Sequence, residues 1–167
     1  MPNVFAVSAA YDLPAGTGLF GGWQIAGILI LESGLPLAVT QNTNFNAFAG
    51  FGTQRPNRLR NGNLPASERM TIRYFDTEAF VLAPQFTLGN SSRNPVRGPG
   101  LRDLDLALLK RTPLKEKIAL EFRAEAFNLT NSPSLGNPNT VFGSPGFGSI
   151  TSAGDPRVLQ LALKLHF

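Results

Sequence analysis

A strict two-residue alternation over the last eleven residues, 157–167, narrows the folds that this chain can adopt. After Arg157, odd-numbered positions are apolar and even-numbered positions are mostly polar or small: Leu159, Leu161, Leu163, Leu165 and Phe167 against Val158, Gln160, Ala162, Lys164 and His166. A helix would spread both sets around its circumference, so the pattern predicts a β-strand with one apolar face. A tilted strand needs about 9–11 residues to cross a bilayer, and this segment has that length.

Two upstream segments repeat the alternation. In 103–111 and 117–126 the even positions other than Lys110 are apolar and the odd positions carry most of the charges: Leu104, Leu106, Leu108, Ile118, Leu120, Phe122, Ala124 and Ala126 against Asp103, Asp105, Arg111, Lys117, Glu121, Arg123 and Glu125. A short link that contains proline, 112–116, separates them. The two segments are therefore expected to form a β-hairpin.

The N-terminal part predicts a second hairpin. Residues 4–12 alternate, with Phe5, Val7, Ala9 and Tyr11 on one side. The second strand is expected within 23–39, where the run Ile25 to Leu31 is apolar at nearly every position. A strand that is covered on both faces would have this composition.

The connections between these strands alternate in length. The links 13–22 and 112–116 are short, whereas 42–100 and 129–156 are long and rich in Gly, Pro, Asn and Phe. Outer-membrane barrels have short periplasmic turns and longer extracellular loops. The pattern predicts an all-β chain with an antiparallel up-and-down sheet of about five strands and long irregular extracellular loops. It leaves open whether 42–100 contains short strands.

Composition excludes disulfides, thiolate metal sites and cysteine nucleophiles, because the chain has no cysteine. Its single histidine is His166, so any site that uses histidine would have to use this residue.

The basic residues are concentrated in one long connection. Seven of the eleven arginines lie in 42–100, opposed there by three acidic residues, and the net charge of the chain is +4. That loop could meet a ligand or anionic lipopolysaccharide, or it could simply be solvated. It lacks the interleaved basic and aromatic residues of a nucleic-acid surface, so no nucleic-acid partner is expected.

Two motifs suggest chemistry, but each has a simpler explanation. Residues 16–21 match the dinucleotide fingerprint G-x-G-x-x-G, yet a strand-like segment follows where a helix should begin, which favours a plain turn. Carboxylates at Asp103, Asp105, Glu121 and Glu125 could act as acid and base, but basic residues share their faces. We therefore expect no catalytic, cofactor or metal site. The first residues of this sequence lack the pattern of a secretion signal, which a preceding part of a longer protein would also explain, and no apolar run reaches membrane-helix length.

Several segments together resemble one family. These are EFRAEAFNLTN at 121–131, followed by Pro133, Asn137 and Pro138, then FGSPGFGSI, the terminal RVLQLALKLHF, and GGWQIAGILILESGLPLAV at 21–39. They resemble the C-terminal part of TonB-dependent receptors of the Oar-like group, whose members carry an N-terminal carboxypeptidase-regulatory-like domain. The resemblance runs from about residue 20 to the end and is most specific in the last third.

The resemblance implies a barrel of about 22 strands in the cell outer membrane, plugged by an N-terminal domain and driven by TonB. Residues 1–167 would be the C-terminal part of such a barrel, without the plug, in a protein that imports a scarce substrate. TonB and the plug would be partners only through a preceding part of the protein. The resemblance also implies a C-terminal signal for the barrel-assembly machinery, formed by Leu159, Leu161, Leu163, Leu165 and Phe167.

In this hypothesis the two faces of the sheet have different environments. The lipid-facing residues would be Leu104, Leu106, Leu108, Ile118, Leu120 and Phe122. The lumen-facing residues would be Asp103, Asp105, Glu121, Arg123, Glu125 and Lys164. The aromatic residues Tyr11, Trp23 and Phe167 are expected at the periplasmic interface. Two alternatives remain: a soluble β-sandwich that binds a ligand such as carbohydrate, and an enzyme on a β-scaffold, for which no nucleophile, base and oxyanion donor assemble.

Overall fold

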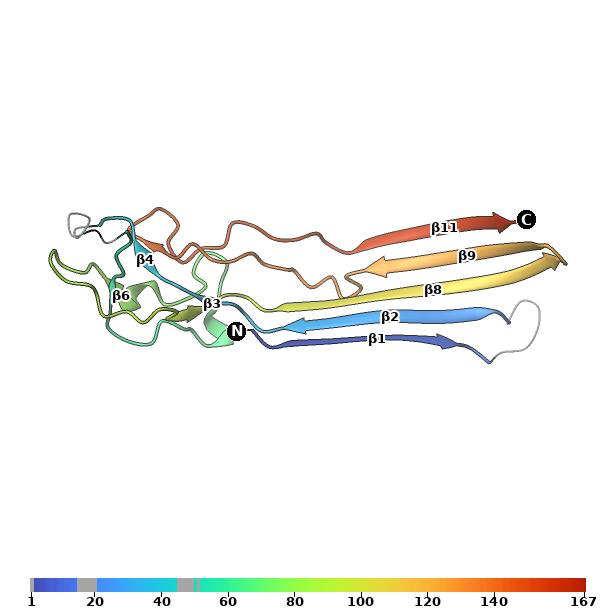
Figure 1. Ribbon diagram of the computed structural model, residues 1–167, viewed down its shortest axis with the longest axis horizontal. Helices are drawn as coiled ribbons and strands as arrows, with labels where there is room; N and C mark the ends of the chain where they lie inside the picture. The colour runs from blue at the N-terminus through green and yellow to red at the C-terminus, as the bar shows by residue number, and fades with distance from the viewer. Residues whose placement is uncertain (1, 15–20, 45–49, 51) are drawn as a thin grey trace. The chain divides into compact units, whose positions relative to one another are not determined.

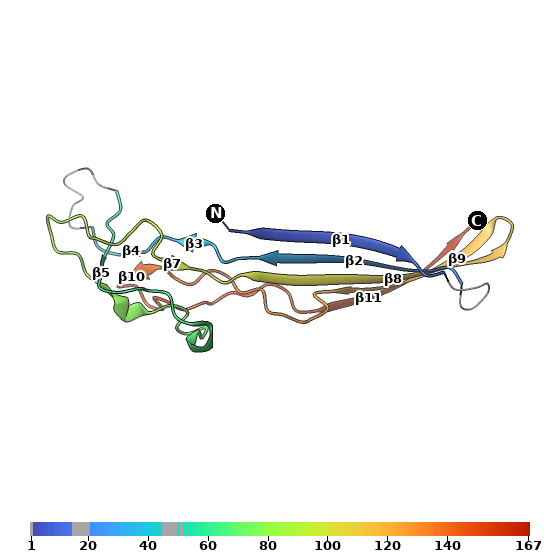
Figure 2. The same ribbon diagram turned by 90° about the horizontal axis from the view of Figure 1, so that it is seen from below.

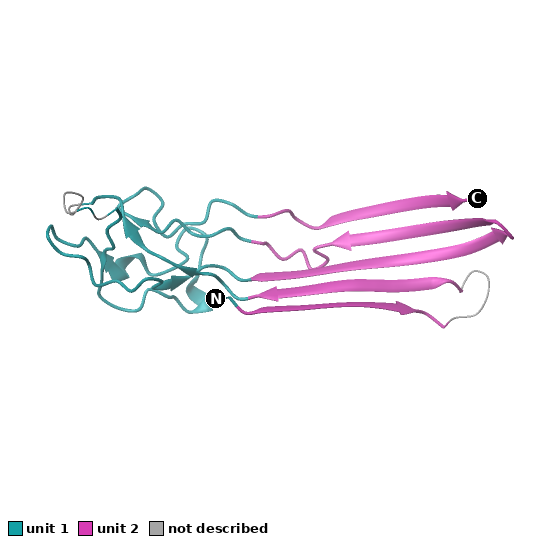
Figure 3. Ribbon diagram, viewed as in Figure 1, with its two compact units in different colours: residues 1–2, 33–100, 135–153 teal, residues 3–32, 101–134, 154–167 magenta. Residues whose placement is uncertain are grey.

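A computed structural model describes residues 2–14, 21–44, 50 and 52–167, and it divides the chain into two compact units. Unit 1 comprises Met1–Pro2, Ser33–Gly100 and Leu135–Ala153; unit 2 comprises Asn3–Glu32, Leu101–Ser134 and Gly154–Phe167 (Figure 3). The described residues form strands and two short 3-10 helices, without an α-helix. None of them forms a helix of the length and hydrophobicity that a membrane crossing requires.

Unit 2 is one five-stranded antiparallel sheet with the strand order β1-β2-β8-β9-β11 (Figure 1). Its strands are β1 (Val4–Asp12), β2 (Trp23–Glu32), β8 (Leu101–Lys115), β9 (Ile118–Phe127) and β11 (Val158–His166). Each strand pairs antiparallel with its neighbour. The predicted all-β class and the up-and-down sheet of five strands are confirmed.

The predicted link at 112–116 is wrong in its position. Strand β8 continues through Thr112 and Pro113 to Lys115, and the turn to β9 comprises only residues 116–117. The register of the β8–β9 pair shifts between Pro113 and Lys115. Proline has no backbone N–H to donate to the ladder, and such an irregularity is where a sheet tolerates it. Proline therefore marks a bulge here, not the end of the strand.

The first hairpin of unit 2 closes tightly at the residues next to its turn. The Leu13 amide donates to the Trp23 carbonyl at 2.9 Å. Gly22 has φ +72°, and a β-carbon on it would lie 2.3 Å from the carbonyl oxygen of Arg111. Only glycine fits this approach between β2 and β8. Most of the G-x-G-x-x-G motif at 16–21 lies outside the described residues.

The sheet of unit 2 is twisted and open. In Figure 2 the ends of β9 and β11 near the C-terminus turn away from the plane of β1 and β2. Strands β1 and β11 form its two edges, and within the described part of the chain neither has a second neighbour in the sheet. Both long connections leave the end of the sheet at which Glu32 pairs with Leu101, and the 116–117 turn lies at the opposite end.

Residues 42–100, for which the sequence left open whether short strands are present, do contain short strands in unit 1. Its described residues form three two-stranded pairs: β3 (Pro36–Leu37) with β7 (Val96–Arg97), β4 (Thr40–Gln41) with β10 (Val141–Phe142), and β5 (Asn57–Arg58) with β6 (Phe80–Val81). The described part of the unit also contains the 3-10 helices η2 (Ala66–Glu68) and η3 (Thr77–Ala79). The two long connections are thus folded together.

A small hydrophobic core, rich in phenylalanine, stabilises unit 1. Its buried residues are Val39, Phe75, Ala79, Phe80 and Val96. The Phe147 ring packs edge-on against Phe75 with 5.2 Å between ring centroids, and against Phe142 with 5.4 Å. Edge-to-face pairs of this kind stabilise by about 0.5–1.5 kcal/mol beyond the area they bury. Residues from both long connections thus contribute to one core.

Asp76 organises the polar part of unit 1. Its side chain is buried and accepts from Arg60 Nε at 2.7 Å, and Arg73 lies 3.7 Å away. It also accepts from the Glu78 amide at 3.2 Å, which caps η3. The hydrogen bond from Arg60 to Asp76 raises the pKa of the arginine. A buried carboxylate is thereby paired and bonded at several points.

The net charge of the chain belongs to unit 1. This unit has seven arginines against three acidic residues, whereas unit 2 has eight basic and eight acidic residues. The chain's formal charge of +4 thus equals that of unit 1. Any attraction of anions by net charge would arise there.

Phe86 has an unfavourable backbone conformation in a turn of unit 1. Its φ is 64°, and the Thr87 amide donates back to the Pro84 carbonyl at 3.3 Å, so Phe86 takes the turn position that favours glycine. Its side chain is 75% exposed. Replacing Phe86 with Gly should stabilise unit 1 by about 1 kcal/mol, because the β-carbon penalty of the left-handed region disappears. Hydrogen exchange of amides in unit 1 measures this.

The control for that prediction is Phe86→Ala, which removes the ring but keeps the β-carbon. It should lack the stabilisation. Equal hydrogen-exchange protection in the glycine and alanine variants would show that backbone strain at Phe86 does not matter.

Candidate functional site: two faces of one sheet

The strand registers of unit 2 assemble one continuous apolar face. Paired residues of antiparallel strands lie on the same side of a sheet, so the registers extend each strand's alternation across all five strands. We call this the apolar face; its apolar members and glycine are Phe5, Val7, Ala9, Tyr11, Trp23, Ile25, Gly27, Leu29, Leu31, Leu104, Leu106, Leu108, Ile118, Leu120, Phe122, Ala124, Ala126, Leu159, Leu161, Leu163 and Leu165. Arg102, Lys110 and Thr112 lie on the same side of the sheet. Every residue predicted to face lipid lies on it.

The opposite side of the sheet, which we call the mixed face, carries the charges. It includes every residue predicted to face the lumen: Asp103, Asp105, Glu121, Arg123, Glu125 and Lys164. Its other members are Val4, Ala6, Ser8, Ala10, Asp12, Gln24, Ala26, Ile28, Ile30, Glu32, Leu101, Ala107, Leu109, Arg111, Pro113, Ala119, Phe127, Val158, Gln160, Ala162 and His166. The two predicted sets are therefore separated by the sheet, although what each face contacts stays a prediction.

Within the described residues, no second sheet covers the leucines of the apolar face on β11. These leucines are exposed, with Leu159 at 70%, Leu161 at 74% and Leu163 at 68%. A β-sandwich would bury them against a second sheet. Phe167, directly after β11, is 97% exposed. The apolar face needs an apolar environment that the described residues do not provide.

The apolar band is slanted relative to the strands. On the edge strand β1 it runs from Phe5 to Tyr11. Through the registers, the row of Ala9 reaches β11 at Leu159, and the row of Tyr11 reaches it at Leu161. On β11, however, the band starts at Leu159 and continues to Leu165. The first and last positions of the band on β11 are therefore each displaced by four residues along the strand, relative to the rows that start at the band's limits on β1. Four strand-to-strand steps separate β1 from β11.

This displacement corresponds to the geometry of a barrel wall. One residue per strand is a rise of about 3.3 Å for each lateral step of about 4.8 Å, which sets the band about 35° from the perpendicular to the strands. Strands of closed barrels tilt by about 35–45° from the barrel axis, with a matching stagger. A level apolar layer would therefore cross this sheet in the same slanted way.

Aromatic and basic side chains mark the limits of the band. At the end near the 116–117 turn, the Lys110 ammonium lies over the Trp23 ring, 4.8 Å from its centroid. At the other end, Arg102 pairs with Leu31 on the apolar face. Long basic side chains and tryptophan favour the boundary between apolar and aqueous phases. That Tyr11 and Trp23 lie at a membrane boundary stays a prediction.

Oppositely charged side chains lie next to one another on the mixed face of β9 and β11. The Arg123 guanidinium lies 3.6 Å from Glu121 and 3.5 Å from Glu125. His166 Nε2 lies 3.2 Å from Glu121, and Lys164 pairs with Glu121 across the strands. These groups are partly exposed, so each pair is worth little by itself. Alternating charges of this kind suit a wall in contact with water or a polar segment.

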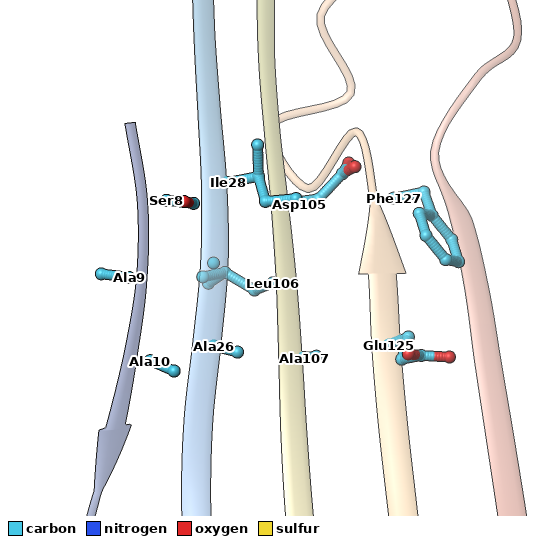
Figure 4. A pocket seen from close by; sticks show the side chains of 11 residues that line it. Ser8, Ala9, Ala10, Ala26, Ile28, Asp105, Leu106, Ala107, Glu125 and Phe127 are labelled. Carbon is cyan, nitrogen blue, oxygen red and sulfur yellow. The ribbon is translucent and has the colours of Figure 1, made fainter. Parts of the chain in front are cut away.

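A hollow of about 380 Å³ lies on the mixed face (Figure 4). Short side chains of Ser8, Ala10, Ala26 and Ala107 form its floor, and longer ones rise beside them: Ile28, Asp105, Glu125 and Phe127.

The sequence predicted that β2 is covered on both faces. That prediction is wrong for the described residues, because Ile28 is 48% exposed on the mixed face and Ile25 is 42% exposed on the apolar face.

The FNLTN segment has a structural role that the sequence analysis did not anticipate. Asn128, directly after β9, has φ 50°, and its amide donates to the Asp105 carboxylate at 2.9 Å. Its side chain accepts from the Ser132 amide at 3.0 Å. Asn131 repeats the positive φ and accepts from Arg157. Asparagine tolerates the left-handed region, so both residues turn the chain at the end of β9.

Three of the four carboxylates considered for catalysis have structural partners. Asp105 accepts from Asn128, and Glu121 and Glu125 flank Arg123. Within the part of the chain that the structure describes, no three His, Asp or Glu residues are placed to hold a metal ion. The expectation that this chain is not an enzyme stays a prediction.

Comparisons with known proteins agree with this geometry. The model of a family described as "Outer membrane beta barrel domain" matches residues 1–160. A search of curated proteins and a search of solved structures each gave no match. The family match covers nearly the whole chain and both units.

Proposed function

Because this chain belongs to the outer-membrane β-barrel domain family and is located in the outer membrane, we propose that unit 2 forms an arc of a larger barrel wall. In this arrangement the apolar face contacts lipid and the mixed face lines the lumen. The observation that carries the proposal is the slanted apolar band. A membrane layer would produce that slant on tilted strands, whereas a globular core would not require it.

The two bare edges of the sheet support an arc over a complete structure. Backbone groups on the outer sides of β1 and β11 need partners in a bilayer, where water cannot satisfy them. Bacterial single-chain barrels have at least about eight strands, more than the five of unit 2. Further strands would pair with both edges. Residues 1–167 would then be the C-terminal part of the barrel domain.

We also propose the finer assignment, a receptor of the TonB-dependent type that imports a scarce substrate. Its support is the resemblance of segments such as 121–131 and 157–167, together with the charged mixed face. Unit 1 would then be extracellular, since its two segments are the long connections, and its net charge of +4 favours anionic contacts. TonB and the plug would act through another part of the protein.

A growth experiment tests the transport function. A strain without this protein is compared with its parent while each nutrient in turn is supplied at a growth-limiting level. The proposal predicts slow growth under one limitation, with the same defect in a strain that lacks active TonB. Normal growth under every limitation, or a defect that does not depend on TonB, would contradict it.

Deletion of Phe167 should reduce assembly in the outer membrane severalfold, because we propose that the end of β11 is read by the barrel-assembly machinery. The measurement is the amount of folded barrel, which migrates differently from heated protein in a detergent gel. Phe167→Tyr keeps an aromatic ring at the chain end and should assemble normally. Equal assembly of the deletion variant would rule out a role for Phe167 as a signal.

A further inference from the structure

A groove of about 400 Å³ lies within the apolar face. Its floor is Ala124 and Ala126 on β9, and its walls are leucines on the two neighbouring strands. The registers explain this form: two successive rows across the sheet read Leu106–Ala126–Leu159 and Leu108–Ala124–Leu161. The groove is thus one strand wide and follows β9, and Phe122 in the next row limits it at one end.

A glycine on β2 helps to keep the groove open. A β-carbon on Gly27 would lie 2.7 Å from a terminal methyl group of Leu106, so the Leu106 side chain occupies the space above Gly27. Leu106 therefore leans away from β9 toward β2. The gap at Gly27 is filled by this leucine, whereas no side chain fills the gap above Ala124 and Ala126.

We infer that an acyl chain of an outer-membrane lipid occupies this groove and remains bound as an ordered lipid. All the side chains that line the groove on this face are hydrocarbon, and none offers a hydrogen-bond donor or acceptor to an occupant. The groove is narrow and lies inside the apolar band, between its basic limits at Arg102 and Lys110, and Lys110 belongs to the row of Phe122 next to the groove. A stable protein partner would cover about 800 Å² of each surface and usually has a polar rim.

The inference rests on the proposed orientation, with the apolar face toward lipid, and it adds a defined site to that face. A generic lipid contact would involve all apolar residues equally. Here two alanine positions between leucine ridges are distinguished from the rest of the face. Filling them should therefore affect lipid retention but not membrane insertion.

The test counts lipids that remain on the protein. The full-length protein is extracted from outer membranes in mild detergent. The phospholipid that remains bound to it is measured by native mass spectrometry. In the double variant Ala124→Leu, Ala126→Leu, retention should fall at least about tenfold, because losing contact with two or more methylene groups weakens binding by that factor. The matched control is Ala9→Leu, the same change in the same row but outside the groove.

A second variant keeps the test valid if the double variant does not fold. Gly27→Ala should push Leu106 toward the groove and also lower retention, with a smaller volume change. Folded migration in a detergent gel is recorded for each protein. If wild-type protein fails that folding assay, the proposed barrel function fails; if it folds but retains lipid no better than the filled variants, only the acyl-chain site fails. A retained polypeptide in place of lipid would likewise overturn the site.

Discussion

Replacing Leu106 with arginine should destabilise the membrane-embedded sheet by about 2–4 kcal/mol, the cost of a basic residue on the lipid side of a barrel near the middle of the bilayer. Leu106 lies between Leu104 and Leu108, in the centre of the apolar band on β8, and between Gly27 and Ala126 across the strands. Neither neighbour in this row carries a charge or a hydrogen-bonding side chain. The guanidinium would therefore have to bend toward a distant headgroup or remain unsolvated.

The matched control is Leu109→Arg, the same substitution on the same strand. Leu109 lies on the mixed face, between Gln24 and Arg123. The new charge would lie beside Arg123, and the repulsion should cost less than about 1 kcal/mol. Urea titration of the protein refolded in lipid vesicles measures both free energies of unfolding. Equal losses at Leu106 and Leu109 would mean that the two faces do not differ in environment.

Replacing Phe75 with alanine should destabilise unit 1 by about 3–5 kcal/mol, which is the usual cost of removing a fully buried phenylalanine. The Phe75 side chain is 1% exposed and contacts the rings of Phe80 and Phe147 edge-on. Because these rings come from both long connections, the loss should spread through the unit. Hydrogen exchange should accelerate in 74–80 and in 142–150 together.

Phe86→Ala is the matched control for this prediction, since it removes the same ring from the same unit at a 75% exposed position. It should leave exchange in 74–80 nearly unchanged. Exchange in the strands of unit 2 should be unaffected by either change, because unit 2 is a separate compact unit. Faster exchange in β8 and β9 of the Phe75 variant would contradict this independence.

Period-two alternation made four of the five strands of unit 2 predictable from sequence, whereas β2 was predicted from its apolar run. The pleat alone decides which side chains share a face, so Leu104, Leu106 and Leu108 could be assigned without knowledge of any partner. The same reasoning separated Glu121, Arg123 and Glu125 from their apolar neighbours. It failed at Pro113, where proline in a bulge has the same local signature as proline in a turn.

Features that depend on pairing could not be read from any single segment. The core of unit 1 joins Val39, Phe75 and Phe147, which are far apart in the chain and belong to no periodic pattern. The groove over β9 exists only because the register places Ala126 between Leu106 and Leu159. Hydrophobic pattern predicts which residues are apolar, but the register decides which of them become neighbours.

The odd number of strands in unit 2 has a consequence for how any barrel wall can be completed. In an antiparallel sheet of five, β1 and β11 point in the same direction. A ring of identical copies would then join β11 of one copy to a parallel β1 of the next. Bacterial barrels are antiparallel throughout and usually even in strand number. An antiparallel barrel with an even number of strands can therefore be closed only if the rest of the protein adds an odd number of strands to these five.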